Sequence, residues 1–257
     1  MIEVRNVTKT FKLSRQQKRE MDSGFQGSSV DAVSNVSFVC KPGRVFGLLG
    51  PNGAGKTTAL RLIATTLKPT TGNILVQGFD TAREPEKVRA ALGFLTGSTQ
   101  LYDRLTPNEI VRYYADLHGV PRDDFERRRA EVFLALDMNS YADRRIGKLS
   151  TGMRQKVSIA RTIIHDPEVL VLDEATSGLD VLASRGIVEL IRRARDRGKT
   201  VLFSTHRMGE VDQLCDDLAL IHRGRLLYDG TYDAFKREMQ APSFEDEFIR
   251  RVEAAGP

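Results

Sequence analysis

Short apolar runs and helical apolar faces alternate along this chain. Residues 45–49 and 169–172 are almost entirely apolar, which is typical of strands buried on both faces of a sheet. Residues 60–67 carry apolar side chains at the spacing of one helical face. Strands that alternate with helices in this way predict a parallel sheet covered by helices on both faces.

The central part of the chain has a different pattern. Between residues 96 and 149 the apolar positions follow helical spacing, with no convincing strand. Thr106, Pro107 and Glu109 have the spacing of a capping box with proline at the first helical position, which predicts a helix start. We therefore expect a helical block inserted into an α/β core. A further helix is expected after Ser243.

Composition narrows the class of protein. The 257 residues include 39 Lys and Arg against 34 Asp and Glu, a net charge of +5, which favours an ordinary solvated surface over a nucleic-acid interface. No run approaches the roughly 18 apolar residues of a membrane span. Cys40 and Cys215 have no metal-ligand spacing and indicate a reducing compartment. We expect neither an integral membrane protein, nor a disulfide scaffold, nor a zinc ribbon.

A glycine-rich loop follows the first apolar run and precedes the helix over 60–67. Residues 50–57 fit the pattern GxxxxGK[ST] in a strand–loop–helix context. Glycines let backbone N–H groups surround phosphate oxygens, the lysine reaches the β- and γ-phosphates, and the hydroxyl binds Mg²⁺. The residues expected to contact a nucleotide here are Gly50, Pro51, Asn52, Gly53, Ala54, Gly55, Lys56, Thr57 and Thr58.

Two adjacent carboxylates end the second apolar run. Asp173 and Glu174 follow residues 169–172 directly, at the edge where parallel sheets bind ligands. We expect Asp173 to hold Mg²⁺, together with Thr57, and Glu174 to polarise the attacking water. A solvated acidic turn is the alternative for such a pair in isolation, and the phosphate loop elsewhere in the chain makes it the weaker one.

Ser150 and Gly152 lie at the start of another helix. A serine hydroxyl and a glycine N–H at such a position can bind a phosphate, although a simple helix cap explains the same residues.

The order of these motifs resembles the nucleotide-binding subunit of an ATP-binding cassette (ABC) transporter. The resemblance covers residues 2–230 and also includes the segment 177–180 and His206 after a strand. Within that family, the amino-acid sequence at residues 101–106, 148–156 and 162–167 is similar to that of the NatA-type ATPases of bacterial sodium exporters. The resemblance implies a RecA-like P-loop fold with an inserted helical subdomain and an N-terminal antiparallel β portion. It also implies hydrolysis of ATP with Mg²⁺.

Further roles follow from the resemblance alone. Ser150 and Gly152 would contact the γ-phosphate of ATP held by a second copy of the chain. Asp180 would link the two sites across that interface, and His206 would orient the attacking water. Phe11 either stacks on the adenine or is a core aromatic. The family's glutamine after the strand near Phe94 is replaced by Gly97, so Gln100 either takes over its Mg²⁺ role or that role is absent.

These expectations define an organisation and a set of partners. We expect an ABC ATP-binding domain over 1–230, with its helical subdomain at about 96–150, and a helical tail over 231–257. The chain would sit peripherally at the cytoplasmic face of the cell membrane. A separate membrane-spanning permease would hold it there, and no nucleic acid would be bound. Sodium export is the expected activity, and drug or glycan export is the alternative. A soluble ABC ATPase acting on ribosomes or DNA is disfavoured, because the chain has one cassette and no coiled-coil insertion.

Overall fold

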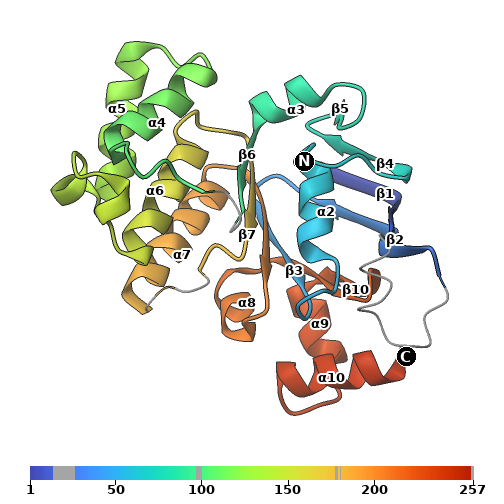
Figure 1. The fold of residues 1–257 in the computed structure, drawn as a ribbon. Helices are drawn as coiled ribbons and strands as arrows, with labels where there is room; N and C mark the ends of the chain where they lie inside the picture. Colours follow the sequence, from blue (N-terminus) through green and yellow to red (C-terminus); the bar gives the residue numbers. More distant parts are fainter. Residues whose placement is uncertain (14–26, 97–99, 177–178, 180, 256–257) are drawn as a thin grey trace.

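A six-stranded sheet forms the centre of the molecule (Figure 1). The computed structural model describes residues 1–13, 27–96, 100–176, 179 and 181–255, with side chains 181–183 excluded. Neighbouring strands of this sheet are parallel, except for the pair β9 and β10 at one edge, which is antiparallel. The strands, in spatial order, are β10 (Arg225–Thr231), β9 (Asp217–His222), β3 (Arg44–Leu49), β8 (Thr200–Thr205), β7 (Val169–Asp173) and β6 (Leu92–Leu95).

A second, antiparallel sheet contains the N-terminal strands. Its order is β2 (Ser29–Cys40), β1 (Ile2–Lys12), β4 (Thr71–Val76) and β5 (Phe79–Asp80). Helix α2 (Lys56–Ile63) packs against both sheets, because its buried side chains share one apolar core with those of β1, β2 and β3. The RecA-like α/β fold with an antiparallel N-terminal portion is confirmed.

Helices cover the other face of the central sheet. A second apolar core contains buried side chains of strands β6, β7 and β8 and of the helices on this face, including those between β6 and β7. Helices α6 (Thr151–Ile163), α7 (Val181–Asp196) and α8 (Met208–Leu214) contribute buried side chains to this second core, whereas α3 (Pro85–Ala91) contributes Val88 to the first core. No helix in the described ranges is long and apolar enough to cross a membrane.

The central block is helical, as the sequence predicts. It contains α4 (Pro107–Leu117), α5 (Arg122–Ala135) and two short 3₁₀ turns, Asn139–Tyr141 and Ile146–Lys148. The capping box at the start of α4 is confirmed: the Thr106 hydroxyl accepts from Glu109 N, and the Glu109 carboxylate accepts from Thr106 N. In Figure 1 this block lies on the side of the molecule opposite the N-terminal sheet.

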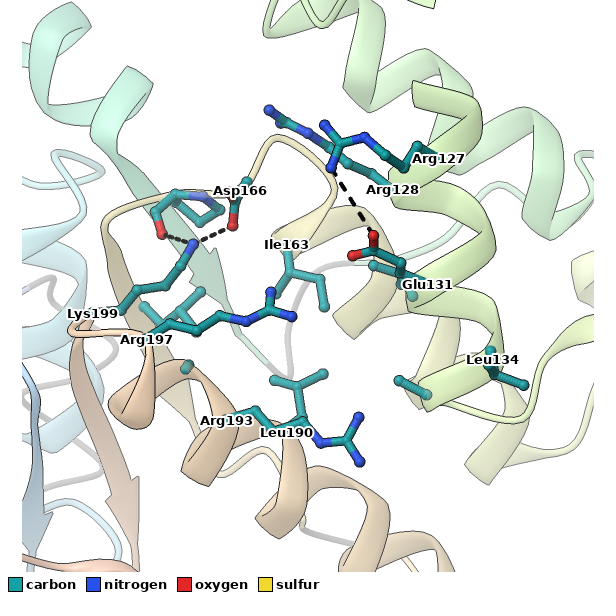
Figure 2. Close-up of a pocket in the computed structure, with 15 residues that line it drawn as sticks. Arg127, Arg128, Glu131, Leu134, Ile163, Asp166, Leu190, Arg193, Arg197 and Lys199 are labelled. Carbon is teal, nitrogen blue, oxygen red and sulfur yellow. Dashed lines mark hydrogen bonds and ion pairs between the residues drawn. The ribbon is translucent and has the colours of Figure 1, made fainter. Parts of the chain in front are cut away.

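The block meets the central sheet around a cavity of about 370 Å³. Figure 2 shows Arg127 and Arg128 of α5 on one side, and Arg193, Arg197 and Lys199 on the other. The cavity wall is tied locally, since Lys199 donates to the carboxylate of Asp166 and to the Pro167 carbonyl. The cavity lies apart from the glycine-rich loop.

The C-terminal tail packs against its own domain. Helices α9 (Tyr232–Glu238) and α10 (Phe244–Ala254) share an apolar cluster with strand β9. The Glu247 carboxylate is buried and binds the guanidinium groups of Arg250 and Arg251. These bonds hold the Glu247 pKa well below its usual range. The domain boundary at residue 230 stays a prediction.

One expectation about local structure needs correction, and two strands were not predicted. The helix expected to reach Leu67 ends at Ile63, because Thr65 takes a left-handed backbone conformation with φ of 61°. Strands β4 and β10 have no counterpart in the sequence pattern. Both are mostly exposed or half-buried, and their apolar runs at 74–76 and 226–228 have only three residues, too few to predict a strand.

Candidate nucleotide-binding site

The glycine-rich loop connects β3 to α2 and is closely packed from behind. Gly55 has a φ of 108°, and a Cβ placed there would lie 2.3 Å from the Ala32 carbonyl oxygen. Only glycine fits a position with both constraints. The Gly224 N–H donates to the Ala54 carbonyl at 2.8 Å, and the Ser34 N–H donates to the Gly224 carbonyl at 2.7 Å. Strand β2 and the β9–β10 turn therefore fix the loop.

The loop encloses a cavity of about 160 Å³, which also includes Ala32 and Glu174. Lys56 is buried beside it, and its Nζ donates to the carbonyls of Gly50 at 2.7 Å and Pro51 at 3.1 Å. Burial lowers the pKa of Lys56, while the nearby carboxylates of Glu174 and Asp173 act in the opposite direction. The cavity thus combines convergent backbone groups with one buried cation, which suits an anionic ligand.

Asp173 and Glu174 reach the site from the end of β7. Asp173 is paired with Ser204 of the parallel strand β8, and the Ser204 hydroxyl donates to Asp173 Oδ1 at 2.6 Å. The same hydroxyl accepts from the Glu174 N–H at 3.1 Å. Glu174 has a φ of 48°, so the chain turns out of the sheet at this residue. Its Oε1 lies 3.8 Å from Lys56 Nζ.

His206 completes this cluster from the end of β8. Its Nδ1 lies 3.3 Å from Glu174 Oε1, and both side chains are partly exposed, at 44% and 31%. An imidazole in contact with a carboxylate at the mouth of a phosphate loop is suitable for positioning a water molecule.

The residues present fit MgATP. The backbone of the glycine-rich loop lines the cavity, and a side chain at Gly55 would displace this backbone. Lys56 lies beside the cavity. Thr57 in the first turn of α2 and Asp173 at the end of β7 would provide oxygen ligands, which Mg²⁺ prefers. When bound, Mg²⁺ neutralises charge on the β- and γ-phosphates.

Ser150 and Gly152 lie elsewhere. Ser150 is the N-cap of α6, and its exposed hydroxyl accepts from Met153 N at 3.3 Å. Neither residue lines the phosphate-loop cavity of its own chain. Further along α6, Gln155 Nε2 donates to the Ala175 carbonyl at 2.8 Å. This bond ties α6 to the segment after Glu174.

Three sequence expectations have less support. Phe11 is 39% exposed near the end of β1, with Lys9 Nζ 5.2 Å from its ring, so it is not a core aromatic. Gln100 is exposed, and its role stays a prediction. Asp180 and Gly97 lie outside the described residues.

Sequence reasoning missed two residues that build the site. Ser204 follows the apolar run of β8, and only its position next to Asp173 in a parallel sheet could have indicated it. Ala32 contributes a backbone carbonyl, for which a sequence carries no signal.

A phosphate loop, a strand ending in Asp-Glu and a histidine beside that glutamate define a P-loop nucleotide hydrolase. The ABC transporter family model matches residues 33–177, and the chain belongs to this family. It is 45% identical to the ABC transporter ATP-binding protein NatA of Bacillus subtilis strain 168, over 87% of this chain and 91% of NatA. It is 34% identical to the linearmycin resistance ATP-binding protein LnrL of the same strain, over 77% of this chain and 64% of LnrL.

Solved structures agree with this assignment. A dimeric post-hydrolysis structure of the ATP-binding cassette MJ0796, bound to ADP and Pi, has a TM-score of 0.77 and 26% identity. It covers 90% of this chain and 98% of that one. The chain is therefore an ABC-type ATPase that uses ATP and Mg²⁺.

Proposed function

We propose that this chain powers an exporter, in which two copies close around two MgATP and drive a separate membrane-spanning permease. The observation that carries the proposal is the cluster of Lys56, Glu174 and His206 at one phosphate loop. An exposed Ser150 at the start of α6 stays outside that cavity. In this proposal, each chain supplies the hydrolytic group of one site and the helix start that binds the nucleotide of the second copy.

Within each site we assign distinct tasks. Lys56 and the loop backbone bind the phosphates, while Thr57 and Asp173 would hold Mg²⁺. Glu174 would orient and polarise the attacking water, and His206, whose Nδ1 contacts that carboxylate, would help to position this water. Ser150 and Gly152 serve the nucleotide of the second copy. The MJ0796 cassette, whose structure in a post-hydrolysis state is dimeric, supports this arrangement.

The membrane partner and the cargo belong to the same proposal. We propose peripheral attachment at the cytoplasmic face of the membrane through the permease, with no nucleic-acid partner. Sodium is the proposed cargo, because the amino-acid sequence at residues 101–106, 148–156 and 162–167 resembles that of NatA-type ATPases of sodium exporters. The 45% identity to NatA supports that choice.

The molar mass of Glu174→Gln in solution tests dimer closure. Blocking hydrolysis should trap the closed state, so light scattering should show about one chain mass without nucleotide and about two with MgATP. Adding Ser150→Asp should restore one chain mass. Aspartate caps a helix about as well as serine does, and it places a negative charge against the phosphate.

The outcomes separate the parts of the proposal. A double variant that still dimerises would show that Ser150 has no role at the second nucleotide. A Glu174→Gln protein that binds MgATP and stays at one chain mass would contradict closure by this chain on its own.

Drug export is the second candidate, because the relative LnrL is named for linearmycin resistance. Inverted membrane vesicles that contain the chain and its permease would distinguish the two. ATP-dependent uptake of radioactive Na⁺, lost in Glu174→Gln, supports sodium export. ATP-dependent drug uptake without Na⁺ movement supports the alternative.

A further inference from the structure

The carboxylate of Glu210 joins two loops that approach the site from different strands. Glu210 lies in α8, and its Oε1 accepts a hydrogen bond from the Thr176 hydroxyl. Its Oε2 accepts from the Thr205 hydroxyl at 2.7 Å. The Glu210 side chain is 14% exposed, so both bonds form in a largely desolvated setting. Each carboxylate oxygen therefore holds a different segment of the chain.

The two threonines lie next to the hydrolytic residues. Thr176 comes two residues after Glu174, and Thr205 comes immediately before His206. The backbone between each threonine and its neighbour is short, so a shift of either loop moves Glu174 relative to His206. The 3.3 Å contact between those side chains depends on that relative position.

Helix α8 supplies a fixed base for this bridge. Val211 and Leu214 of α8 are buried in the surrounding cores, so the helix is anchored on one face. The Arg207 N–H donates to the Thr205 hydroxyl oxygen at 2.9 Å, and the Arg207 guanidinium lies 3.7 Å from Glu210 Oε1. Glu210 itself is not among the residues that line the phosphate-loop cavity. Among the described residues, its two hydrogen bonds lead to the loops that carry Glu174 and His206.

We propose that Glu210 is a positioning residue, which holds Glu174 and His206 in register during ATP hydrolysis without touching the nucleotide. This inference rests on the roles assigned above to Glu174 and His206. Removing the bridge should lower kcat and leave nucleotide binding unchanged, because the hydrogen bonds and the ion pair of Glu210 in the described structure involve neither Lys56 nor the phosphate loop.

The full-length chain carries the test, with steady-state ATP hydrolysis and equilibrium binding of a fluorescent ATP analogue measured for each variant. Glu210→Ala should lower kcat by about tenfold or more, since misplacement by about 1 Å can cost on the order of 100-fold. Glu210→Gln should recover much of the loss. Its amide oxygen can accept from one threonine while its NH₂ donates to the other. Binding of the analogue should stay within about twofold throughout.

Asp212→Ala is the matched control. Asp212 lies on the same helix and also accepts from a hydroxyl, that of Tyr232, as well as contacting Lys236. It touches neither loop in the described structure, so its kcat should stay within about twofold of the wild type.

A double-mutant cycle distinguishes the bridge from general destabilisation. Thr176→Val alone should lower kcat, and adding it to Glu210→Ala should cause no further loss, because the shared bond is already absent. Additive losses, an unchanged kcat in Glu210→Ala, or an equal loss in Asp212→Ala would each overturn the inference. Glu174→Gln is assayed in parallel: if it retains hydrolysis, the assigned catalytic role fails, independently of Glu210.

Discussion

Nδ1 of His206 lies 3.3 Å from Oε1 of Glu174, although the two residues are 32 positions apart in the chain. The contact arises because β7 and β8 are parallel neighbours, so residues following both strands emerge at the same edge of the sheet. Each group then limits where the other can place a water molecule.

His206→Ala should reduce kcat for ATP hydrolysis by about 100-fold, in the range typical for loss of an acid–base group. Binding of MgATP should change far less, because the phosphate loop is intact. His118→Ala, at an exposed histidine in the helical block, is the control. Equal rates in the two variants would remove His206 from the reaction.

Gly55→Ala should weaken binding of MgATP by at least about tenfold, because the new Cβ meets the Ala32 carbonyl and displaces the loop. Gly78→Ala is a suitable comparison. Gly78 also has a positive φ, of 82°, but it has open space around it and lies in the turn between β4 and β5. Isothermal titration should show nucleotide affinity unchanged in Gly78→Ala. Similar losses in both variants would mean that backbone strain alone, and not the contact with Ala32, weakens binding.

Gln155→Ala should lower the free energy of unfolding by about 1 kcal/mol, the usual contribution of one hydrogen bond. It should also reduce ATP-dependent dimerisation of the Glu174→Gln protein, because α6 loses its tie to Ala175. Urea unfolding and light scattering report these two effects separately. A dimer of unchanged affinity would show that α6 holds Ser150 in place without this bond.

The stability of the protein should fall in mild acid because of His165. Burial, and next the neighbouring His118, lower its pKa from 6.5 to about 4. Below the ordinary pKa the unfolded chain binds a proton there that the folded chain does not, so unfolding becomes easier. Between neutral pH and about pH 5 the expected loss is about 2 kcal/mol.

His165→Phe keeps a ring for stacking on His118, which lies 3.7 Å away between centroids, and removes the titrating group. Urea unfolding of this variant should show a flatter pH profile than the wild type over the same range. Parallel profiles would assign the acid sensitivity to other residues.

The parts of the site that follow a regular strand could be predicted from sequence. The glycine loop and the pair Asp173 and Glu174 each come directly after an apolar run, so their place at the sheet edge follows from the pattern. The capping box at Thr106 could also be predicted, because it depends on local spacing alone. Strands β4 and β10 could not, since they pair antiparallel at partly exposed positions and lack that pattern.

Contacts between distant segments explain most of what sequence could not supply. The bridge through Glu210 joins side chains 34 and 5 positions away, and only the fold brings them together. The support of Gly55 by Ala32 is a backbone contact, which leaves no residue-type signature. The early end of α2 depends on the conformation of Thr65, at a position whose apolar neighbours continue the helical pattern.

Lys56 binds the carbonyls of Gly50 and Pro51, so the phosphate loop is held in its curved form by its own lysine. Ordering a residue of a disordered loop opposes binding by about 1–2 kcal/mol. Here that entropy has already been lost when the chain folds, and an incoming nucleotide only exchanges two carbonyl partners of the ammonium group for phosphate oxygens. Capture of ATP is therefore expected to be limited by diffusion into an open cavity, and the slow steps of the cycle to lie in the motions that follow.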